Sequence, residues 1–409
     1  IQQRMEAIEQ KFFGRMNSAR DNVLDFEELG VDFLYVDEAH EFRKLDFTSN
    51  QSNLKGVDPM GSMRALDLLV KARWLDRQRP NRSLVLASGT PLTNTMAELY
   101  SIQRFLGPKK LIADGFDSFD GWARQYGKVK EEIEPNAAGQ YQPVKRFSRF
   151  INTGVLMQGV QQFMDVLTLQ QMIEEGVVKV PAIKGGKPQI VVGEPSAALT
   201  EYKKGELSQR IEASKNWKPS PPDEMHNPDP MIAIIGDAQL AGFDMRFIDP
   251  KLPSDPTSKL NLMIDGIIDS YNAHNDVEYL NPETGEPYPI KGAAHIVFTY
   301  GGIGEGVIQN RGFDSKSWIR TRLIEGGVPN TEIAFMSDYK KTSQKEAMFR
   351  EMREGKKKIL IATPKNAGTG VNVQLRLKTL HYGMAPWNPA DVEQPDGRIV
   401  RQGNQNDEV

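Results

Sequence analysis

Val31-Asp32-Phe33-Leu34-Tyr35-Val36-Asp37-Glu38-Ala39-His40 is the stretch that decides the fold. Its apolar run predicts a buried β-strand over Phe33 to Val36, and two carboxylates and a histidine follow at once. In parallel α/β sheets, ligands gather at the carboxyl ends of the strands. The stretch therefore predicts a parallel sheet whose ligand-binding edge carries Asp37 and Glu38.

Asp37 and Glu38 suit one kind of chemistry at such an edge. A carboxylate there can hold Mg²⁺ on ATP, and a glutamate beside it can orient or deprotonate the attacking water. The alternative interpretation is an acidic turn after a strand, and so short a match does not decide between the two.

The composition is that of an ordinary globular protein. The chain has 409 residues, which predicts two or three domains, and 26% of them are charged. No run of about 18 apolar residues occurs, so no membrane-spanning helix is expected. Cysteine is absent, which excludes disulfides and thiolate zinc sites and suits a reducing compartment. Because the net charge is −3, a surface for nucleic acid would have to be local.

Strand and helix patterns alternate on both sides of an irregular middle. Before it, we expect a polar helix over 1–22, a helix over 61–79, a strand over 83–87 and a helix ending at Leu106. After it, we expect strands over 295–299, 333–336, 358–362 and 379–382, a helix over 315–324, and a capping box at Ser343 to Glu346 that opens a helix to Arg353. In the middle, 161–175 has helical character and 214–231 is a proline-rich loop. The alternation predicts an α/β fold with parallel sheets, in two lobes over 1–184 and 185–409, with a loop-rich helical insertion over 205–290.

Three further motifs follow the acid pair in order. Ser88-Gly89-Thr90-Pro91 ends the second strand, although alone it would be an ordinary turn. Residues 362–374 form a glycine-bearing loop that would let backbone N–H groups approach phosphates, or simply a connection. Arg398 and Arg401 share one face if their segment is helical, and they suit a phosphate or a solvated basic face. Pro395 fits the first turn of such a helix. Four motifs in this order favour a nucleotide site over coincidence.

In order and spacing, these motifs resemble those of the superfamily-two helicase-like ATPases, especially the Swi/Snf-type translocases on double-stranded DNA. Leu86 to Thr95 with Glu98-Leu99-Tyr100 is similar to the third motif of that class, and Trp387-Asn388-Pro389 with 394–402 is similar to its last motifs. More narrowly, Val36 to His40, with its Asp-Glu-Ala-His box, and Arg146-Phe147-Ser148-Arg149-Phe150 resemble the helicase part of very large phage and mobile-element proteins. Those proteins fuse an adenine DNA methylase to a Swi/Snf-like helicase, and some are anti-restriction factors.

The resemblance implies two RecA-like lobes with the first one truncated, ATP and Mg²⁺ as cofactors, and double-stranded DNA as the partner. It also implies a place in the cytoplasm of a bacterial host. The implied roles are Mg²⁺ binding for Asp37, water activation for Glu38, coupling of the lobes for His40, Ser88 and Thr90, nucleotide binding for Gly368, Gly370 and Gln394, γ-phosphate contact for Arg398 and Arg401, and DNA contact for Thr363, Lys365 and Trp387.

The phosphate-binding Gly-Lys-Ser/Thr loop of such ATPases does not occur in this sequence. We therefore expect the chain to be a fragment whose remaining polypeptide, with the phosphate-binding loop upstream and possibly a methylase domain, is its partner. Residues 1–409 alone are then expected to hydrolyse ATP poorly or not at all. The alternative is a non-hydrolysing DNA-binding or scaffolding module that retains the helicase fold.

Overall fold

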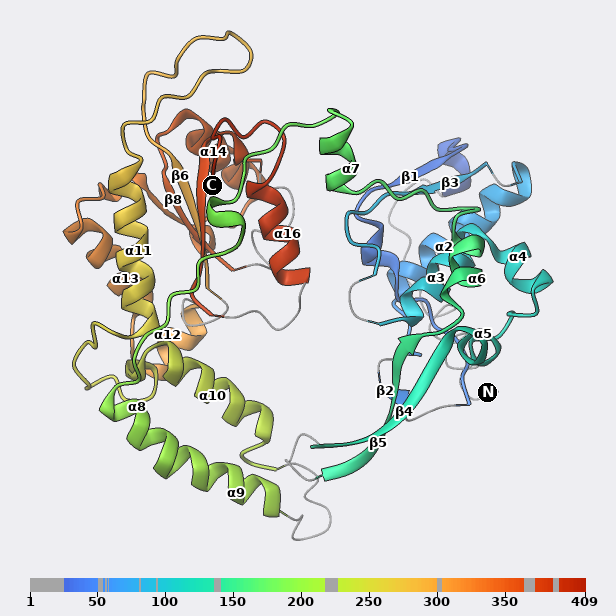
Figure 1. Ribbon diagram of the computed structural model, residues 1–409, viewed down its shortest axis with the longest axis horizontal. Helices are drawn as coiled ribbons and strands as arrows, with labels where there is room; N and C mark the ends of the chain where they lie inside the picture. Colours follow the sequence, from blue (N-terminus) through green and yellow to red (C-terminus); the bar gives the residue numbers. More distant parts are fainter. Residues whose placement is uncertain are drawn as a thin grey trace. The chain divides into compact units, whose positions relative to one another are not determined.

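A computed structural model shows the chain as two compact units, each described here by itself (Figure 1). The structure describes residues 26–50, 54–55, 57, 59–80, 82–92, 95–135, 141–217, 227–299, 304–363, 372–384 and 390–409. The helix expected over 1–22 and most of the expected glycine-bearing loop lie outside these residues. None of the helices in these ranges combines the length and the apolar character that crossing a membrane requires.

Leaving residues 135–141 aside, the first unit ends at Val166 and the second begins at Leu167. The sequence pattern suggests a later boundary, after residue 184. Backbone pairing with the C-terminal tail explains the difference, because the Ala182 N–H donates to the Asp407 carbonyl at 2.9 Å and the Val409 N–H donates to the Ala182 carbonyl at 2.8 Å. Residues 182–184 therefore pack with the second unit.

The first unit contains the predicted strand and a parallel neighbour. β1 (Leu34–Val36) pairs with β3 (Leu84–Leu86), with Leu34 opposite Leu84. α2 (Met63–Gln78) connects them and begins after Ser62, whose hydroxyl accepts a hydrogen bond from the Ala65 N–H. The expected strand–helix–strand unit is confirmed.

One face of this two-stranded sheet is exposed, so the prediction of a buried strand is wrong. Tyr35 is 80% exposed and Val85 is 41% exposed. Side chains alternate along a strand, and the leucines and valine of the other face pack against Leu68 and Phe105. Among the described residues, β1 pairs with β3 alone, so its other edge has no strand neighbour.

A second sheet and four helices complete the first unit. β2 (Leu54–Lys55), β5 (Tyr141–Phe150) and β4 (Gly127–Pro135) lie in the order β2-β5-β4. The helices are α3 (Ala97–Leu106), α4 (Pro108–Ala113), α5 (Phe119–Tyr126) and α6 (Thr153–Val160). The indole of Trp122 is fully buried, with its ring centroid 5.6 Å from that of Tyr100 and 6.4 Å from that of Phe150. An aromatic core thus fixes the sheet to α3 and α5.

The second unit is built on four parallel strands. β6 (Ala294–Phe298), β7 (Ile333–Phe335), β8 (Ile359–Ala362) and β9 (Leu377–Tyr382) lie in the order β7-β8-β6-β9. All four expected strands are confirmed, and with them the α/β class with parallel sheets.

Helices cover both faces of this sheet. Val297, Ile359 and Ile361 pack on one face against α11 (Lys259–Ala273) and α13 (Ser315–Glu325). Ile296, Phe298 and Leu360 pack on the other face against α14 (Thr342–Glu354) and α16 (Ala390–Ile399). Alternate residues of each strand therefore reach opposite cores, as in sheets that are buried on both sides.

Two helix starts differ from the sequence prediction. Residues 161–168 are not helical, and α7 (Leu169–Glu174) begins after Thr168, whose hydroxyl accepts a bond from the Gln171 N–H. α14 begins before Ser343, since Gln344 Oε1 accepts bonds from the N–H groups of Lys340 and Lys341 at 3.1 Å. The capping residue is thus Gln344 rather than the predicted Glu346.

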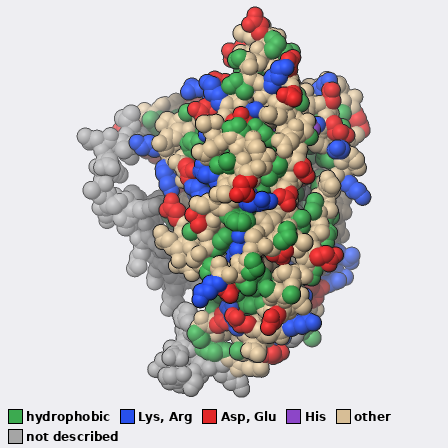
Figure 2. All heavy atoms as spheres, turned by 90° about the vertical axis from the view of Figure 1, so that its left-hand side faces the viewer, with side chains coloured by type: hydrophobic (Ala, Val, Ile, Leu, Met, Phe, Trp, Pro, Cys, Tyr) green, Lys and Arg blue, Asp and Glu red, His purple; other side chains and the backbone are tan. Residues whose placement is uncertain are grey.

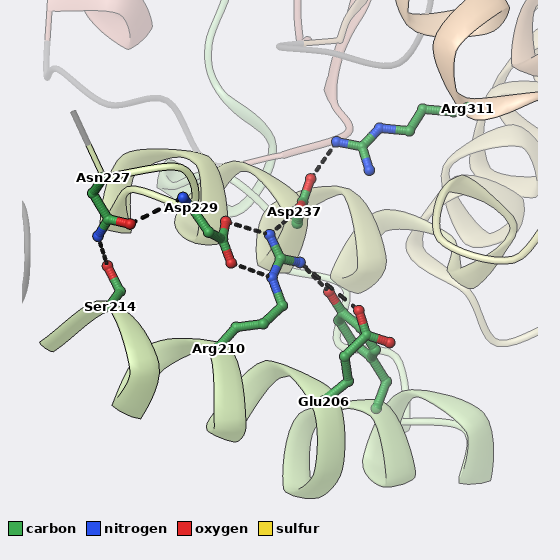
Figure 3. A network of polar contacts seen from close by, with 8 residues as sticks. Glu206, Arg210, Ser214, Asn227, Asp229, Asp237 and Arg311 are labelled. Carbon is green, nitrogen blue, oxygen red and sulfur yellow. Dashed lines mark hydrogen bonds and ion pairs between the residues drawn. The ribbon is translucent and has the colours of Figure 1, made fainter. Parts of the chain in front are cut away.

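A helical arm precedes the sheet of the second unit. It comprises α8 (Ala197–Tyr202), the π-helical turn η4 (Lys203–Leu207), α9 (Ser208–Asn216) and α10 (Met231–Phe243). Figure 3 shows its polar network, in which Arg210 donates to both oxygens of Asp229 at 2.8 and 2.9 Å and to Asp237 at 2.7 Å. Asp237 also accepts a bond from Arg311, at the end of α12 (Glu305–Arg311). The arm is thereby fastened to α12 through one carboxylate.

Short 3₁₀ turns connect these elements. They are η1 (Phe26–Leu29), η2 (Ala39–Phe42), η3 (Lys184–Gly186), η5 (Met245–Phe247), η6 (Asn330–Glu332), η7 (Met336–Asp338) and η8 (Gln374–Arg376). On the face of the molecule shown in Figure 2, acidic and basic side chains are interspersed. That face carries no large patch of a single sign.

Candidate functional site

The acid pair follows β1 directly and faces solvent. Asp37 and Glu38 form the turn between β1 and η2, and both are exposed. Glu38 has φ of 50° and ψ of 43°, the left-handed region that non-glycine residues seldom adopt. The Glu38 N–H donates to Asp37 Oδ1 at 2.8 Å. The turn therefore holds a strained glutamate beside a carboxylate, which is a common feature of functional sites.

Backbone hydrogen bonds hold the loop after β1 against the loop after β3. The Ala87 N–H donates to the Val36 carbonyl at 2.8 Å, and the Ala39 N–H donates to the Ala87 carbonyl at 2.9 Å. The parallel pairing thus continues past both strands. Asp37, Glu38 and Ser88 consequently lie at the same edge of the sheet, as the sequence predicts.

His40 is the side chain that joins the two loops. It is 6% exposed, and its Nδ1 lies 3.2 Å from Ser88 Oγ and 3.2 Å from Glu38 Oε2. Its Nε2 lies 3.8 Å from Glu41 Oε1. The Thr90 N–H donates to Ser88 Oγ at 3.1 Å, so Thr90 is linked to His40 through one hydroxyl. The structure therefore brings Glu38, His40, Ser88 and Thr90 together.

The predicted positions of the second unit are only partly described. Thr363 follows β8 directly, and Gln394 belongs to α16. Lys365, Gly368, Gly370 and Trp387 lie outside the described residues. Their predicted roles are not tested by the structure.

The arginine segment differs from the expected geometry. α16 ends at Ile399, so Arg398 is in its last turn and Arg401 lies beyond it, exposed. One helical face does not carry both side chains. Pro395 is buried in the interior of α16 rather than in its first turn, where it removes one backbone donor. Asn404 Nδ2 donates to the Ile399 carbonyl at 2.9 Å and to the Leu377 carbonyl at 2.8 Å, which fixes the end of the helix against β9.

Exposed carboxylate oxygens are suitable ligands for Mg²⁺, which keeps several waters and binds one or two protein carboxylates with substrate phosphates. Asp37 and Glu38 provide such oxygens at a strand end. The donor set of this edge therefore fits the metal and nucleotide that the sequence motifs imply.

Parts of the chain are similar to known proteins. Residues 1–168 match a family described as a probable helicase domain. The chain is 22% identical over 192 residues to Defense against restriction protein B of Escherichia phage P1, an alignment that covers 46% of this chain and 8% of that protein. A solved structure titled the C-terminal part of the Fun30 ATPase domain is similar at 11% identity and a TM-score of 0.34, covering 56% of this chain and 84% of the other. The first part of the chain is thus similar to helicase domains, and the chain spans a small share of its phage relative.

Sequence reasoning assigned no role to Arg43 and Glu98, which lie next to the site. Arg43 Nε donates to Glu98 Oε1 at 3.0 Å, and Arg43 Nη1 donates to the His40 carbonyl at 2.6 Å. Glu98 is 3% exposed in the first turn of α3. The available signal was Glu98 in the motif that follows Ser88, since a carboxylate among apolar helix residues needs a cation nearby.

Proposed function

We propose that this chain is the core of an ATP-dependent translocase or helicase on double-stranded DNA, in which ATP hydrolysis is coupled to DNA movement. The observation that supports it most is the His40–Ser88 contact at 3.2 Å, beside an exposed acid pair at a strand end. Such a contact lets the loop that carries the acid pair respond to the loop after β3. The match of residues 1–168 to a helicase family is consistent with this proposal.

The chain's own residues would divide the work as follows. Asp37 would hold Mg²⁺ on ATP, and Glu38 would orient and deprotonate the attacking water; the bound Mg²⁺ would supply charge stabilisation for phosphoryl transfer. His40, which contacts both Glu38 and Ser88, would couple the position of Glu38 to that of Thr90 and the loop after β3. The left-handed backbone of Glu38 fits this role, since strained residues cluster at active sites.

The remaining predicted positions stay proposals. Gly368, Gly370 and Gln394 would bind nucleotide, and Arg398 and Arg401 would contact its γ-phosphate. Thr363, Lys365 and Trp387 would contact the DNA backbone. The absence of a shared helical face means that Arg398 and Arg401 would have to approach a phosphate from different backbone segments.

The biological setting is also a proposal. The relative from phage P1 is named for defence against restriction, and the chain spans 8% of its length. We place this chain in a larger phage or mobile-element protein of DNA modification or anti-restriction, acting in the cytoplasm of a bacterial host. The rest of that polypeptide would supply the phosphate-binding loop and possibly a methylase domain.

The decisive experiment compares duplex-stimulated ATP hydrolysis and displacement of a third strand from a DNA triplex by the protein that carries this chain. Glu38→Gln should lower hydrolysis by about 100-fold or more, because it removes the base. Asp67→Asn, a matched change on the exposed face of α2, should leave hydrolysis within about twofold, since surface pairs contribute little. Hydrolysis undiminished by Glu38→Gln would contradict the proposal, and duplex binding without any hydrolysis would support the scaffolding alternative.

A further inference from the structure

The β4–β5 hairpin of the first unit carries a group of cations to which the nucleotide site gives no role. Lys128 and Lys130 lie on β4, and Lys145, Arg146 and Arg149 lie on β5. The motif Arg146 to Phe150 falls in this hairpin. We propose that the base of the hairpin is a contact surface for the phosphate backbone of duplex DNA. The inference rests on the proposed function for its choice of partner.

Four of these cations are exposed and make no ion pair. The side chains of Lys128, Lys130, Lys145 and Arg149 have no hydrogen-bonding or ionic partner among the described residues. Some other cations of the unit do have carboxylate partners, as in the pairs Lys71–Asp67, Arg79–Asp32 and Lys110–Asp114 at 2.7 to 3.0 Å. The hairpin therefore carries four positive charges that no described carboxylate pairs.

The base of the hairpin is fixed before any partner binds. Phe147 is buried in the aromatic core, and a Cβ on Gly127 would lie 1.8 Å from its ring, so only glycine fits there. Ser148 Oγ donates to the Lys128 carbonyl at 2.9 Å, and the Ile151 N–H donates to the Tyr126 carbonyl at 2.8 Å. A rigid base lowers the entropic cost of presenting these cations to a ligand.

The spacing of the cations suits a nucleic-acid backbone. The two strands are joined by a short connection, so they form an antiparallel ribbon. Residues two apart on a strand are on the same side and about 6.6 Å apart. Phosphates of one DNA strand recur about every 3.4 Å along the helix axis and lie farther apart along the winding backbone, so Lys128 and Lys130 are spaced to contact neighbouring phosphates. The major groove also admits a two-stranded β-ribbon.

Acidic residues define the outer limit of the surface. Glu131 and Glu132 follow Lys130 on β4, farther from α5 than Lys128 and Lys130. Like charges would repel phosphates there. The contact is therefore at the base of the hairpin, where Lys128, Lys130 and Arg149 lie closest to the body of the unit.

The test is fluorescence anisotropy of a labelled DNA duplex titrated with the full chain, without nucleotide, at several salt concentrations. Reversing Lys128, Lys130, Lys145 and Arg149 to glutamate should weaken binding by about 100-fold at low salt and reduce the salt slope by about 3 to 4. Changing the three lysines to arginine should leave both within about twofold. Unchanged circular dichroism and thermal midpoint establish that the variants fold.

A matched control reverses Lys109, Lys184, Lys187 and Lys204, which are exposed and lie outside the hairpin. This control changes net charge equally and should keep most of the affinity. An equal loss in the control, an unchanged salt slope in the hairpin variant, or no duplex binding by the wild-type chain would each overturn the inference. If the hairpin variant binds normally while hydrolysis depends on Glu38, only the hairpin inference fails. If it loses binding while Glu38→Gln has no effect on hydrolysis, only the proposed function fails.

Discussion

Arg43 and Glu98 form an ion pair next to the candidate site, with Arg43 Nε 3.0 Å from Glu98 Oε1. Glu98 is almost fully buried, and Arg43 Nη1 also donates a hydrogen bond to the carbonyl of His40. The pair thereby connects α3 to the segment that follows the acid pair. Removing one partner should therefore cost more stability than removing a partner of an ordinary surface pair, because it leaves a buried charge unpaired.

Glu98→Ala should lower the free energy of unfolding of the first unit by about 2 to 3 kcal/mol, because it leaves the Arg43 guanidinium without its buried partner. Arg64→Ala removes an exposed pair with Glu41 and should cost under about 1 kcal/mol. Hydrogen exchange of peptides from α2 and α3 measures both. Equal effects would show that burial of Glu98 does not strengthen the pair.

Glu38→Gly should stabilise the first unit while it removes the proposed base. Glycine adopts the left-handed region without the penalty that a Cβ carries there, so the gain relative to Glu38→Ala should be about 1 kcal/mol. Both variants lack the carboxylate, and both should lose ATP hydrolysis. Urea denaturation of the two variants gives the difference, and an alanine variant as stable as the glycine variant would rule out strain at this residue.

The sequence predicts β1, β3 and the strands of the second unit well because each is a local apolar run, whereas it predicts none of the strands of the β2-β5-β4 sheet. Short apolar runs such as Ile359 to Ala362 predicted all four strands of the second unit, and the acid pair and Ser88 were expected at one sheet edge. The exposure of Tyr35 was not predictable, because an apolar run does not show whether other elements pack on both faces of its sheet.

Long-range side-chain contacts account for the other differences. The end of α16 before Arg401 depends on Asn404, which bonds the carbonyls of Ile399 and Leu377, and no local pattern encodes that contact. Glu98 and Arg43 are 55 residues apart, so their pairing required the fold. Pro395 in a helix interior also contradicts local propensity, and its own side chain is buried.

Asp237→Asn should loosen the helical arm of the second unit. Asp237 accepts bonds from Arg210 and Arg311, and an amide would leave two guanidiniums without their shared negative charge (Figure 3). We expect a loss of about 2 kcal/mol and faster hydrogen exchange in α9 and α10. Glu206→Gln alters only an exposed pair at 4.0 Å with Arg210 and is the control, with a loss of at most about 0.5 kcal/mol. Unchanged exchange in the Asp237 variant would show that apolar packing alone holds the arm.

Acidification should destabilise the second unit through two histidines in its sheet, His295 on β6 and His381 on β9. His295 Nδ1 lies 2.7 Å from Thr379 Oγ1, which lies 3.0 Å from His381 Nε2. Burial lowers the pKa of His295 well below its ordinary value, helped by the nearby His381 and His274, and burial lowers the pKa of His381 to about 4. In the folded chain both rings therefore stay neutral at a pH where unfolded histidines, with a pKa of about 6.5, take up protons.

The sign of the effect follows from this difference. Between about pH 6.5 and pH 4 the unfolded state binds more protons than the folded state. The free energy of unfolding therefore has its highest value above pH 6.5 and decreases as the pH falls. His381 is half-buried, so its share at pH 5 should be about 1 to 2 kcal/mol. Urea denaturation at pH 7.5 and pH 5 measures the loss. His295→Asn with His381→Gln keeps nitrogen donors near Thr379 but removes both titrations, so most of the pH dependence should disappear. If the double variant loses as much stability as the wild type between these two pH values, other groups cause the acid sensitivity.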